Sequence, residues 1–379
     1  MQVTPPDLAS LILWLLPGLS PSRLQRLRAQ TQLNDAALLQ ALPDLPGLRD
    51  ELRQMARLAL DHPQRLPFYA TLQAHLEWQD RGGVLLDFAQ YPRVLQHLSD
   101  PPKLLCVQGD PQLLFDPSVA LVGSRLPSAE GQRNAREWAH WLAWQGVGVV
   151  SGLARGVDAA AHRGCLAAQK AGASGGALAF VAQGLDRVYP PEHADLMQQM
   201  TQQGAVISEY PLGTAPLGRH FPARNRLITG VSLGVVVVEA RLKSGSMVSA
   251  RLAMDQGREV MAIPGSIRHQ ESEGCHALIR QGAQLVSHPL QVLESLYLPL
   301  KHQLQATSDE ALVMESASTC DHLSQDEKQL IQQLGSAPVD LDALHQQLEW
   351  PVADLLVHLQ ALELKGMIEN QLGGWVRQA

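Results

Sequence analysis

The pattern of hydrophobic and polar positions changes twice along the chain. Over residues 1–80, apolar positions recur every three or four residues in short stretches that Pro-Gly or Asn-Asp interrupts, which is the period of amphipathic helices. The predicted helices are residues 8–16, 21–30, 35–42 and 47–60. We therefore expect residues 1–80 to fold as a small helical domain.

A Leu-Pro-Gly-Leu phrase occurs twice in that domain, at 16–19 and at 45–48. Turns of this kind occur in helix-hairpin-helix modules, which hold a DNA phosphate at a helix N-terminus. A SAM-like helical bundle with glycine turns would show the same pattern, and the turns lack the paired glycines of a strong hairpin signal. The sequence leaves both interpretations open.

Between residues 81 and 298, short apolar runs alternate with helical stretches. The predicted strands are 83–87, 104–108, 119–122, 148–151, 178–182, 205–208, 235–239 and 259–263, and the predicted helices are 128–145, 156–171, 192–203 and 245–256. Most of the strands are apolar throughout, as in a parallel sheet that helices cover on both faces. The alternation predicts a Rossmann-like, doubly wound α/β domain, in which ligands bind beyond the carboxyl ends of the strands.

The C-terminal part has a third pattern. Residues 299–322 lose periodicity and are predicted to be a linker. A capping box at 324–327 opens a helix, 339–348 and 352–365 are helical, and 367–377 form a hairpin around Gly373 and Gly374. Three helices and a hairpin predict a winged-helix domain over residues 323–379.

The composition is that of a soluble globular protein of two or three domains, with 379 residues, 45% hydrophobic and 18% charged. The net charge of −7 gives no support for a nucleic-acid partner, but the charge is uneven. Residues 91–300 carry 18 basic and 16 acidic side chains, whereas residues 323–379 carry 3 basic and 8 acidic ones. We therefore expect the winged-helix domain to contact protein and not a DNA groove.

Cysteine spacing and hydropathy exclude several other classes. The four cysteines, Cys106, Cys165, Cys275 and Cys320, have no zinc-like spacing and are predicted to be reduced and structural. The apolar stretch 8–16 is too short to span a bilayer. We expect a cytoplasmic protein that has no membrane anchor, no metal and no cofactor.

The loop after the strand 119–122 is the first candidate site. Gly123 allows a sharp turn, Ser124 or Ser128 can cap the following helix, and Arg125 presents a guanidinium fork that fits a phosphate. Free N–H groups at the start of a helix favour the same anion. A plain strand–helix turn with a surface arginine would look the same.

Further loops at the carboxyl ends of the predicted strands are rich in small residues, polar residues and arginine. Residues 216–226 are predicted to be a loop, and residues 211–238 hold three arginines and no acidic residue. Such a local field attracts phosphates even in an acidic protein, and Phe221 supplies a flat face for a base. The candidate binding residues in these loops are Ser151, Gly152, Arg155, Gly156, Arg219, Phe221, Arg224, Asn225, Arg226, Ser244, Gly245 and Ser246.

Catalytic patterns are weak in this sequence. It has no Walker A loop, no dinucleotide fingerprint and no His-Glu-x-x-His motif. Asp158 and His162 lie four residues apart on a predicted helix, where they could form an acid–base pair or a pair that stabilises the domain. Glu239, at a strand end, is the best single catalytic candidate, and it is equally well placed to hold neighbouring loop N–H groups.

The chain resembles the DprA/Smf family of DNA-processing recombination mediators from residue 91 to residue 287. The ordered matches are Tyr91-Pro92, Asp100–Pro102, Val122–Arg125, Ser151–Asp158 with Ala161-His162, Gly184–Asp186 with Tyr189-Pro190, Ser208–Pro211, Phe221–Arg226, Val238–Ala240 with Ser244–Ser246, Gly257-Arg258, Ile263–Gly265, and Leu278-Ile279 with Gly282-Ala283. The flanking helical and winged-helix segments are similar to the usual accessory domains of the family.

The resemblance implies a Rossmann-like domain that binds single-stranded DNA without chemical turnover, forms a homodimer and loads RecA during natural transformation. In this family phosphates meet the arginine that corresponds to Arg125, and Phe221, Arg224, Asn225 and Arg226 supply further contacts. The loop of Ser151, Gly152 and Gly156 adjoins them. Asp158, His162 and Glu239 are then supporting residues.

Two positions depart from the family pattern. Many relatives have a lysine three residues before the phenylalanine, where this chain has Gly218, so Arg219 is expected to supply that charge. Relatives usually have Gly-x-Gly-Leu-Asp after the fourth core strand, and here Ala182 replaces the first glycine.

An enzymatic alternative remains at this point. The core also resembles nucleotide-processing enzymes of the lysine-decarboxylase-like group, which release a base from a nucleoside monophosphate. Glu239 with the segment 244–246 is a looser version of their catalytic loop.

Overall fold

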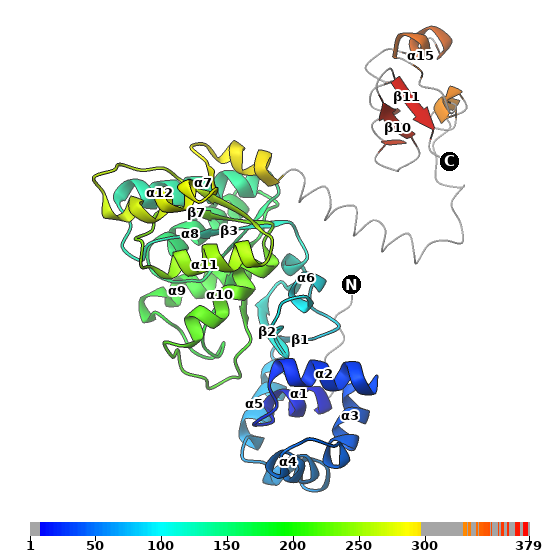
Figure 1. Cartoon of the computed structure of the whole chain (residues 1–379), viewed down its shortest axis with the longest axis vertical. Helices are drawn as coiled ribbons and strands as arrows, with labels where there is room; N and C mark the ends of the chain where they lie inside the picture. The colour runs from blue at the N-terminus through cyan, green and yellow to red at the C-terminus, as the bar shows by residue number, and fades with distance from the viewer. Residues whose placement is uncertain are drawn as a thin grey trace. The chain divides into compact units, whose positions relative to one another are not determined.

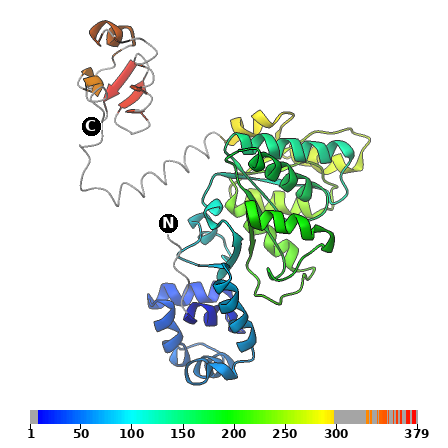
Figure 2. The ribbon, with the colours of Figure 1, turned by 180° about the vertical axis from the view of Figure 1, so that it is seen from behind.

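The computed structural model describes residues 8–296 without interruption, and short segments between residues 329 and 377. The chain divides into two compact units, residues 1–303 and 304–379. Figures 1 and 2 show the helical part, the α/β part and the C-terminal unit along the chain. Within the described residues, no helix is long and apolar enough to cross a membrane, and no cluster of three His, Cys, Asp or Glu side chains could hold a metal ion.

The N-terminal part is helical, as its periodicity predicts. Its helices are α1 (Leu8–Leu15), α2 (Pro21–Thr31), α3 (Asp35–Ala41), α4 (Asp50–Asp61) and α5 (Tyr69–Asp80), with short 3₁₀ turns at Leu42–Asp44 and Pro63–Arg65. Ser20 and Asn34 cap α2 and α3 by accepting backbone N–H groups. Helix α5 is absent from the predicted set, because its hydrophobic period is weak.

A nine-stranded sheet forms the centre of the α/β part. Its strands are β1 (Val84–Asp87), β2 (Leu104–Gly109), β3 (Ser118–Val122), β4 (Gly148–Ser151), β5 (Ala177–Phe180), β6 (Ala205–Ser208), β7 (Gly234–Val237), β8 (Glu259–Ala262) and β9 (Gln284–Leu285). Their order is β1-β2-β6-β5-β4-β3-β7-β8-β9. The β1–β2 and β2–β6 pairs are antiparallel, and the other neighbours are parallel.

Helices cover both faces of this sheet. The helices are α6 (Arg93–Gln96), α7 (Ala129–Trp144), α8 (Val157–Lys170), α9 (Ala194–Gln203), α10 (His220–Val231), α11 (Gly245–Asp255) and α12 (Glu273–Arg280), with 3₁₀ turns at Pro111–Leu114, Pro191–His193 and Gln270–Ser272. Val119 and Leu121 of β3 pack into the core with α7, α8 and α9, whereas Ala120 and Val122 pack into the core with α10, α11 and α12. The alternation confirms the predicted doubly wound fold.

One predicted loop is a helix. The sequence predicts a loop over residues 216–226, but α10 begins at His220. Pro222 is compatible with this start because a proline in the first turn removes an N–H that has no partner inside the helix. Leu227, Ile228 and Val231 face the core, and their burial favours the helix.

The C-terminal unit contains the predicted hairpin. Its described elements are helix α15 (Leu341–Leu348) and the antiparallel strands β10 (Ile368–Gln371) and β11 (Gly374–Arg377). Leu344, Leu355, Leu359 and Trp375 are buried in a core of their own. The predicted linker 299–322 and the capping box 324–327 lie outside the described residues, as does Cys320, whereas Cys106, Cys165 and Cys275 are buried free thiols.

Candidate nucleic-acid interface

The sheet reverses its order at β3, and this places several loops at one edge. β3 pairs with β4 on one side and with β7 on the other, although β7 comes much later in the chain. In an open α/β sheet such a switch point forms a crevice at the carboxyl ends of the strands. The loops after β3, β4 and β5 and the start of α10 line one pocket at this edge, and Glu239, after β7, bonds to Ser128 in the loop after β3.

Arg125 and Phe221 meet at this crevice. The Cζ atom of Arg125 lies 5.5 Å from the centre of the Phe221 ring, in cation–π geometry. The ring of Tyr189 lies 5.5 Å from the Phe221 ring at an angle of 55°. These side chains come from the loops after β3 and β5 and from the first turn of α10, so only the tertiary fold brings them together.

A small pocket of about 40 Å³ opens beside this cluster. It is lined by Arg125, Gly152, Leu153, Ala154, Arg155, Ala182, Gln183, Tyr189, Pro190 and Phe221. Proteins that bind single-stranded nucleic acids combine aromatic faces with positive charge. The bases stack on the aromatic rings, and the phosphates pair with the cations. Tyr189 is absent from the residues that the sequence singled out as binding residues. The sequence signal that could have identified Tyr189 is an aromatic residue in a loop at the carboxyl edge of the sheet.

The loop between β4 and α8 has an unusual backbone. Leu153 has a φ of 55° and Gly156 a φ of 75°. The Asp158 carboxylate accepts hydrogen bonds from the backbone N–H groups of Gly152 and Ala154, at 3.1 and 3.3 Å. His193 Nδ1 lies 3.0 Å from the carbonyl oxygen of Leu153. These bonds fix a backbone that a leucine rarely adopts.

Arg224 lies behind this loop and not at the surface. The residue is 4% exposed, and a Cβ atom built on Gly152 would lie 1.6 Å from its Nη1 atom. Burial lowers the pKa of Arg224 to about 10, the nearby Asp158 opposes this shift, and the charge of Arg125 adds to it. The buried guanidinium therefore leaves no room for a side chain at position 152. Arg224 packs beneath the loop and supports it.

Two other predicted arginines form ion pairs. Arg226 donates to both carboxylate oxygens of Glu209, each at 2.7 Å, and its side chain is 12% exposed. Arg155 is exposed and pairs with Glu192. Arg219, the residue before α10, is exposed, and Asn225 is half-buried on the first turns of that helix. Of the arginines predicted to bind DNA, Arg125 and Arg219 thus face solvent and have no ion pair among the described residues.

Glu239 is engaged by the start of α7. Its Oε2 atom accepts the Ser128 backbone N–H at 2.8 Å, and its Oε1 atom accepts the Ser128 hydroxyl at 2.5 Å. Ser128 in turn caps α7, with Gly131 donating to its Oγ atom. The carboxylate therefore joins the loops after β3 and β7, which is the holding role that the sequence left open. Ser244 and Gly245 stand at the start of α11, where Ser246 is buried.

Asp158 and His162 are not hydrogen-bonded to each other. Asp158 bonds to the loop backbone, and both ring nitrogens of the fully buried His162 lack a hydrogen-bond partner within the part of the chain that the structure describes. Burial lowers the pKa of His162 to about 3, with contributions from the positive charge of Arg224 and from His193. Burial raises the pKa of Asp158, and Arg224 opposes this shift. This pair has no acid–base geometry in the structure.

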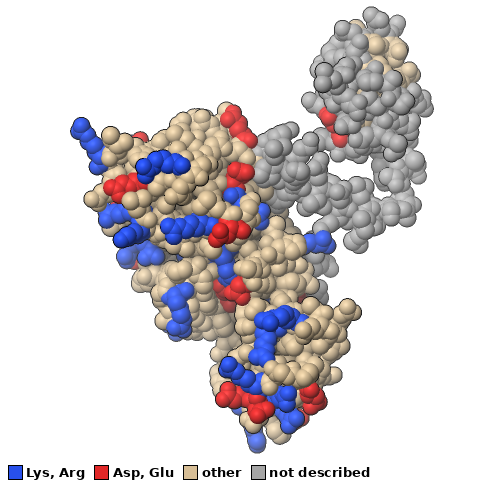
Figure 3. Space-filling view, viewed as in Figure 1, with Lys and Arg blue, Asp and Glu red and all other residues tan. Residues whose placement is uncertain are grey.

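Charge on the face seen in Figure 3 is scattered, with acidic side chains beside many of the basic ones.

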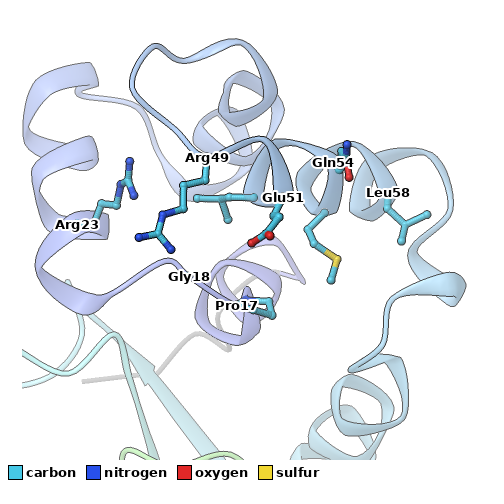
Figure 4. A pocket seen from close by; sticks show the side chains of 9 residues that line it. Pro17, Gly18, Arg23, Arg49, Glu51, Gln54 and Leu58 are labelled. Carbon is cyan, nitrogen blue, oxygen red and sulfur yellow. The ribbon is translucent and has the colours of Figure 1, made fainter.

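A groove of about 420 Å³ opens separately in the helical part, beside the first Pro-Gly turn (Figure 4). Arg23 and Arg49 reach into it, and Arg23 donates to the carbonyl oxygen of Gly47 in the second turn, at 2.5 Å. Glu51 lines the groove as well, so the charges are mixed and the helix-hairpin-helix interpretation stays a hypothesis.

Comparison with known proteins decides the family. A family model described as DNA recombination-mediator protein A matches residues 84–297, and one described as the DprA winged helix domain matches residues 314–374. The chain belongs to the DprA/Smf family. It is 37% identical to protein Smf of Escherichia coli over 330 residues, which cover 86% of this chain and 84% of that protein.

Solved structures of DprA proteins agree with this membership. The X-ray structure of DprA from Streptococcus pneumoniae superposes with a TM-score of 0.65 at 34% identity, covering 77% of this chain and 98% of that one. A structure concerned with the single-stranded DNA binding mode of DprA from Helicobacter pylori superposes with a TM-score of 0.52 at 32% identity, covering 57% of this chain and 96% of that one. This DprA/Smf chain is therefore one of the DNA-processing recombination mediators, with a Rossmann-like core and a winged-helix domain.

Proposed function

We propose that this DprA/Smf chain binds single-stranded DNA at the crevice beyond β3, β4 and β5, without chemical turnover. The observation that carries the proposal is the exposed guanidinium of Arg125 beside the rings of Phe221 and Tyr189. A phosphate pairs with the guanidinium while the adjacent base stacks on an aromatic face. Single-stranded DNA binding by the Helicobacter pylori DprA supports the same assignment.

Most of the candidate residues fall into two groups in this proposal. Arg125, Phe221, Tyr189 and Arg219 contact the strand directly, as do the backbone N–H groups of the loops that contain Gly123, Ser124, Arg155 and Gly156. Arg224, Arg226, Asp158 and Glu239 hold those loops in place through the contacts described above. Asn225 and the segment 244–246 remain predicted contacts at the starts of α10 and α11.

We further propose that the chain acts as a homodimer that protects incoming DNA and loads RecA onto it during natural transformation. This rests on the family resemblance. Sedimentation analysis tests the dimer, and RecA filament growth on DNA coated with a single-strand-binding protein tests the loading. A monomer, or filament growth that the chain does not accelerate, would refute the respective step.

Fluorescence anisotropy with labelled oligo-dT, repeated over a range of salt concentrations, tests the DNA-binding step. We expect tight binding, and we expect the logarithm of the binding constant to fall linearly with the logarithm of the salt concentration. Incubation with nucleoside monophosphates tests the enzymatic alternative. Release of free base would favour that alternative, but Glu239 would first have to leave Ser128, which occupies both of its oxygens.

A further inference from the structure

The N-terminal helical part touches the segment that leads to the candidate DNA site. His75, on α5, is fully buried, and its Nε2 atom accepts a hydrogen bond from the backbone N–H of Leu212, at 3.1 Å. Residues 75 and 212 are 137 positions apart in the sequence. Leu212 belongs to the segment 209–219, which joins β6 to α10 and ends beside Phe221.

The position of the ring proton of His75 follows from its two partners. His75 Nδ1 lies 2.7 Å from the carbonyl oxygen of Thr71, one turn earlier on α5, so Nδ1 carries the proton and donates. Nε2 then carries no proton and can only accept a hydrogen bond. The Leu212 N–H donates that bond. The Trp14 ring packs edge-on against His75, with the ring centres 5.0 Å apart, and holds the imidazole in this orientation.

The segment 209–219 connects this contact to the DNA site. Two residues before Leu212, the ring of Tyr210 stacks on that of His220, 4.1 Å away at an angle of 21°. His220 also lies 3.1 Å, through Nδ1, from the carbonyl oxygen of Ala182. It immediately precedes Phe221, whose ring meets Arg125. The segment thus links Leu212, through the Tyr210–His220 stack, to the residue that precedes Phe221.

The opposite side of the segment is held by the loop after β5. Asp186 accepts the backbone N–H of Gly213 at 2.8 Å, and the backbone N–H of Gly184 donates to the carbonyl oxygen of Thr214 at 3.0 Å. The segment is thus fixed on one side by the sheet domain and on the other by α5. Without the α5 contact, the Leu212 N–H would lose its partner in a partly buried site, which is unfavourable.

We propose that His75 is a positioning residue for the DNA site, through which the N-terminal helical part fixes the segment that presents Phe221. This rests on the proposed function at the crevice. It gives the helical part a role in DNA binding that requires no direct contact with DNA. The carbonyl oxygens of Leu13 and Trp14, which accept from Lys103 at 3.4 and 2.7 Å, anchor the same helical part to the sheet domain.

A pair of substitutions separates this role from general packing. An asparagine at position 75 reaches only as far as Nδ1 does, so His75→Asn can keep the bond to Thr71 but loses Leu212. A glutamine reaches the position of Nε2, so His75→Gln can keep the acceptor for Leu212. Leu38→Ala serves as the matched control, because Leu38 is fully buried in the same helical part and is remote from the segment in sequence.

Hydrogen exchange of the Leu212 amide and oligo-dT affinity are measured for each full-length variant. In His75→Asn we expect the amide to exchange roughly tenfold faster and the affinity to fall about fivefold, the size of one lost hydrogen bond. In His75→Gln both values stay close to wild type. In Leu38→Ala the melting temperature falls while the affinity stays within about twofold.

Three outcomes would overturn the inference: unchanged affinity in His75→Asn, equal losses in the asparagine and glutamine variants, or an equal loss in Leu38→Ala. Failure of the proposed function is seen separately, because wild-type protein would then not bind oligo-dT. The amide exchange rate would still report whether His75 holds the segment.

Discussion

The guanidinium of Arg125 lies over the ring of Phe221, with 5.5 Å between Cζ and the ring centre. Arg125 comes from the loop between β3 and α7 and Phe221 from the start of α10, and these two helices cover opposite faces of the sheet. A single strand offers phosphates to the cation and bases to the aromatic face. Because the two side chains are in contact, each can be substituted singly while the other is kept.

Substitution of Arg125 by alanine should weaken oligo-dT binding by about 1.5–3 kcal/mol, because a charge-assisted hydrogen bond to phosphate is lost. The salt dependence should become shallower by about 0.7 per lost phosphate contact on a single strand. Anisotropy titrations at several salt concentrations measure both values. Lys170→Ala is the matched control, since Lys170 is exposed at the far end of α8. An unchanged salt slope in Arg125→Ala would remove that residue from the site.

Substitution of Phe221 by alanine should cost roughly 1–3 kcal/mol of binding free energy if a base stacks on it. Tyr189→Ala should cause a similar loss, whereas Tyr189→Phe should keep most of the affinity because the ring is retained. Fluorescence titration with oligo-dT measures all three. If Phe221→Ala lowers the melting temperature and leaves the affinity intact, the ring is a packing residue only.

Substitution of Gly152 by alanine should destabilise the protein, because the new methyl group would lie 1.6 Å from Arg224 Nη1 and must displace a buried guanidinium. We expect a loss of about 1–3 kcal/mol in the free energy of unfolding, together with weaker DNA binding. Gly218→Ala is the control, since a Cβ atom there meets nothing within 4 Å. Thermal melts of both variants decide the outcome, and equal melting temperatures would contradict the buried position of Arg224.

Acid should destabilise the fold partly through His162. Its pKa is about 3 in the folded protein, against 6.5 for an ordinary histidine, so the unfolded chain binds the proton first. The free energy of unfolding should therefore fall as pH drops below about 6.5, and this contribution should level off near pH 3. In His162→Leu the decrease should be smaller. Denaturant titrations at pH 7, 6, 5 and 4 test this, with exposed His269→Leu as the control; parallel curves for wild type and His162→Leu would contradict the assignment.

Deletion of residues 323–379 should leave oligo-dT binding nearly intact. The deleted part holds 3 basic and 8 acidic side chains, so its removal takes away little attraction for phosphate. It also lies within the C-terminal unit, which has its own core. Anisotropy compares the truncated and full chains under the same salt conditions. A loss of more than about tenfold would show that the winged-helix domain holds DNA.

The class of fold follows from the sequence alone, because hydrophobic periodicity is a local property. Apolar runs such as 119–122 and 148–151 favoured strands covered on both faces, and the stretches between them had the period of helices. The loop glycines and Arg125 pointed to the carboxyl edge of the sheet as the candidate site. The ordered motifs were specific enough to indicate the DprA/Smf family, which the comparisons confirm.

The surroundings of each candidate side chain could be known only from the fold, because burial and partners depend on residues distant in the sequence. Arg125, Arg224 and Arg226 are chemically equivalent in the sequence, yet the first is exposed, the second lies beneath Gly152 and the third is paired with Glu209. Tyr189 meets Phe221, and His75 meets Leu212, across long separations along the chain. No local pattern encodes such contacts, since they arise when the strands pair and the loops between them are brought to one edge.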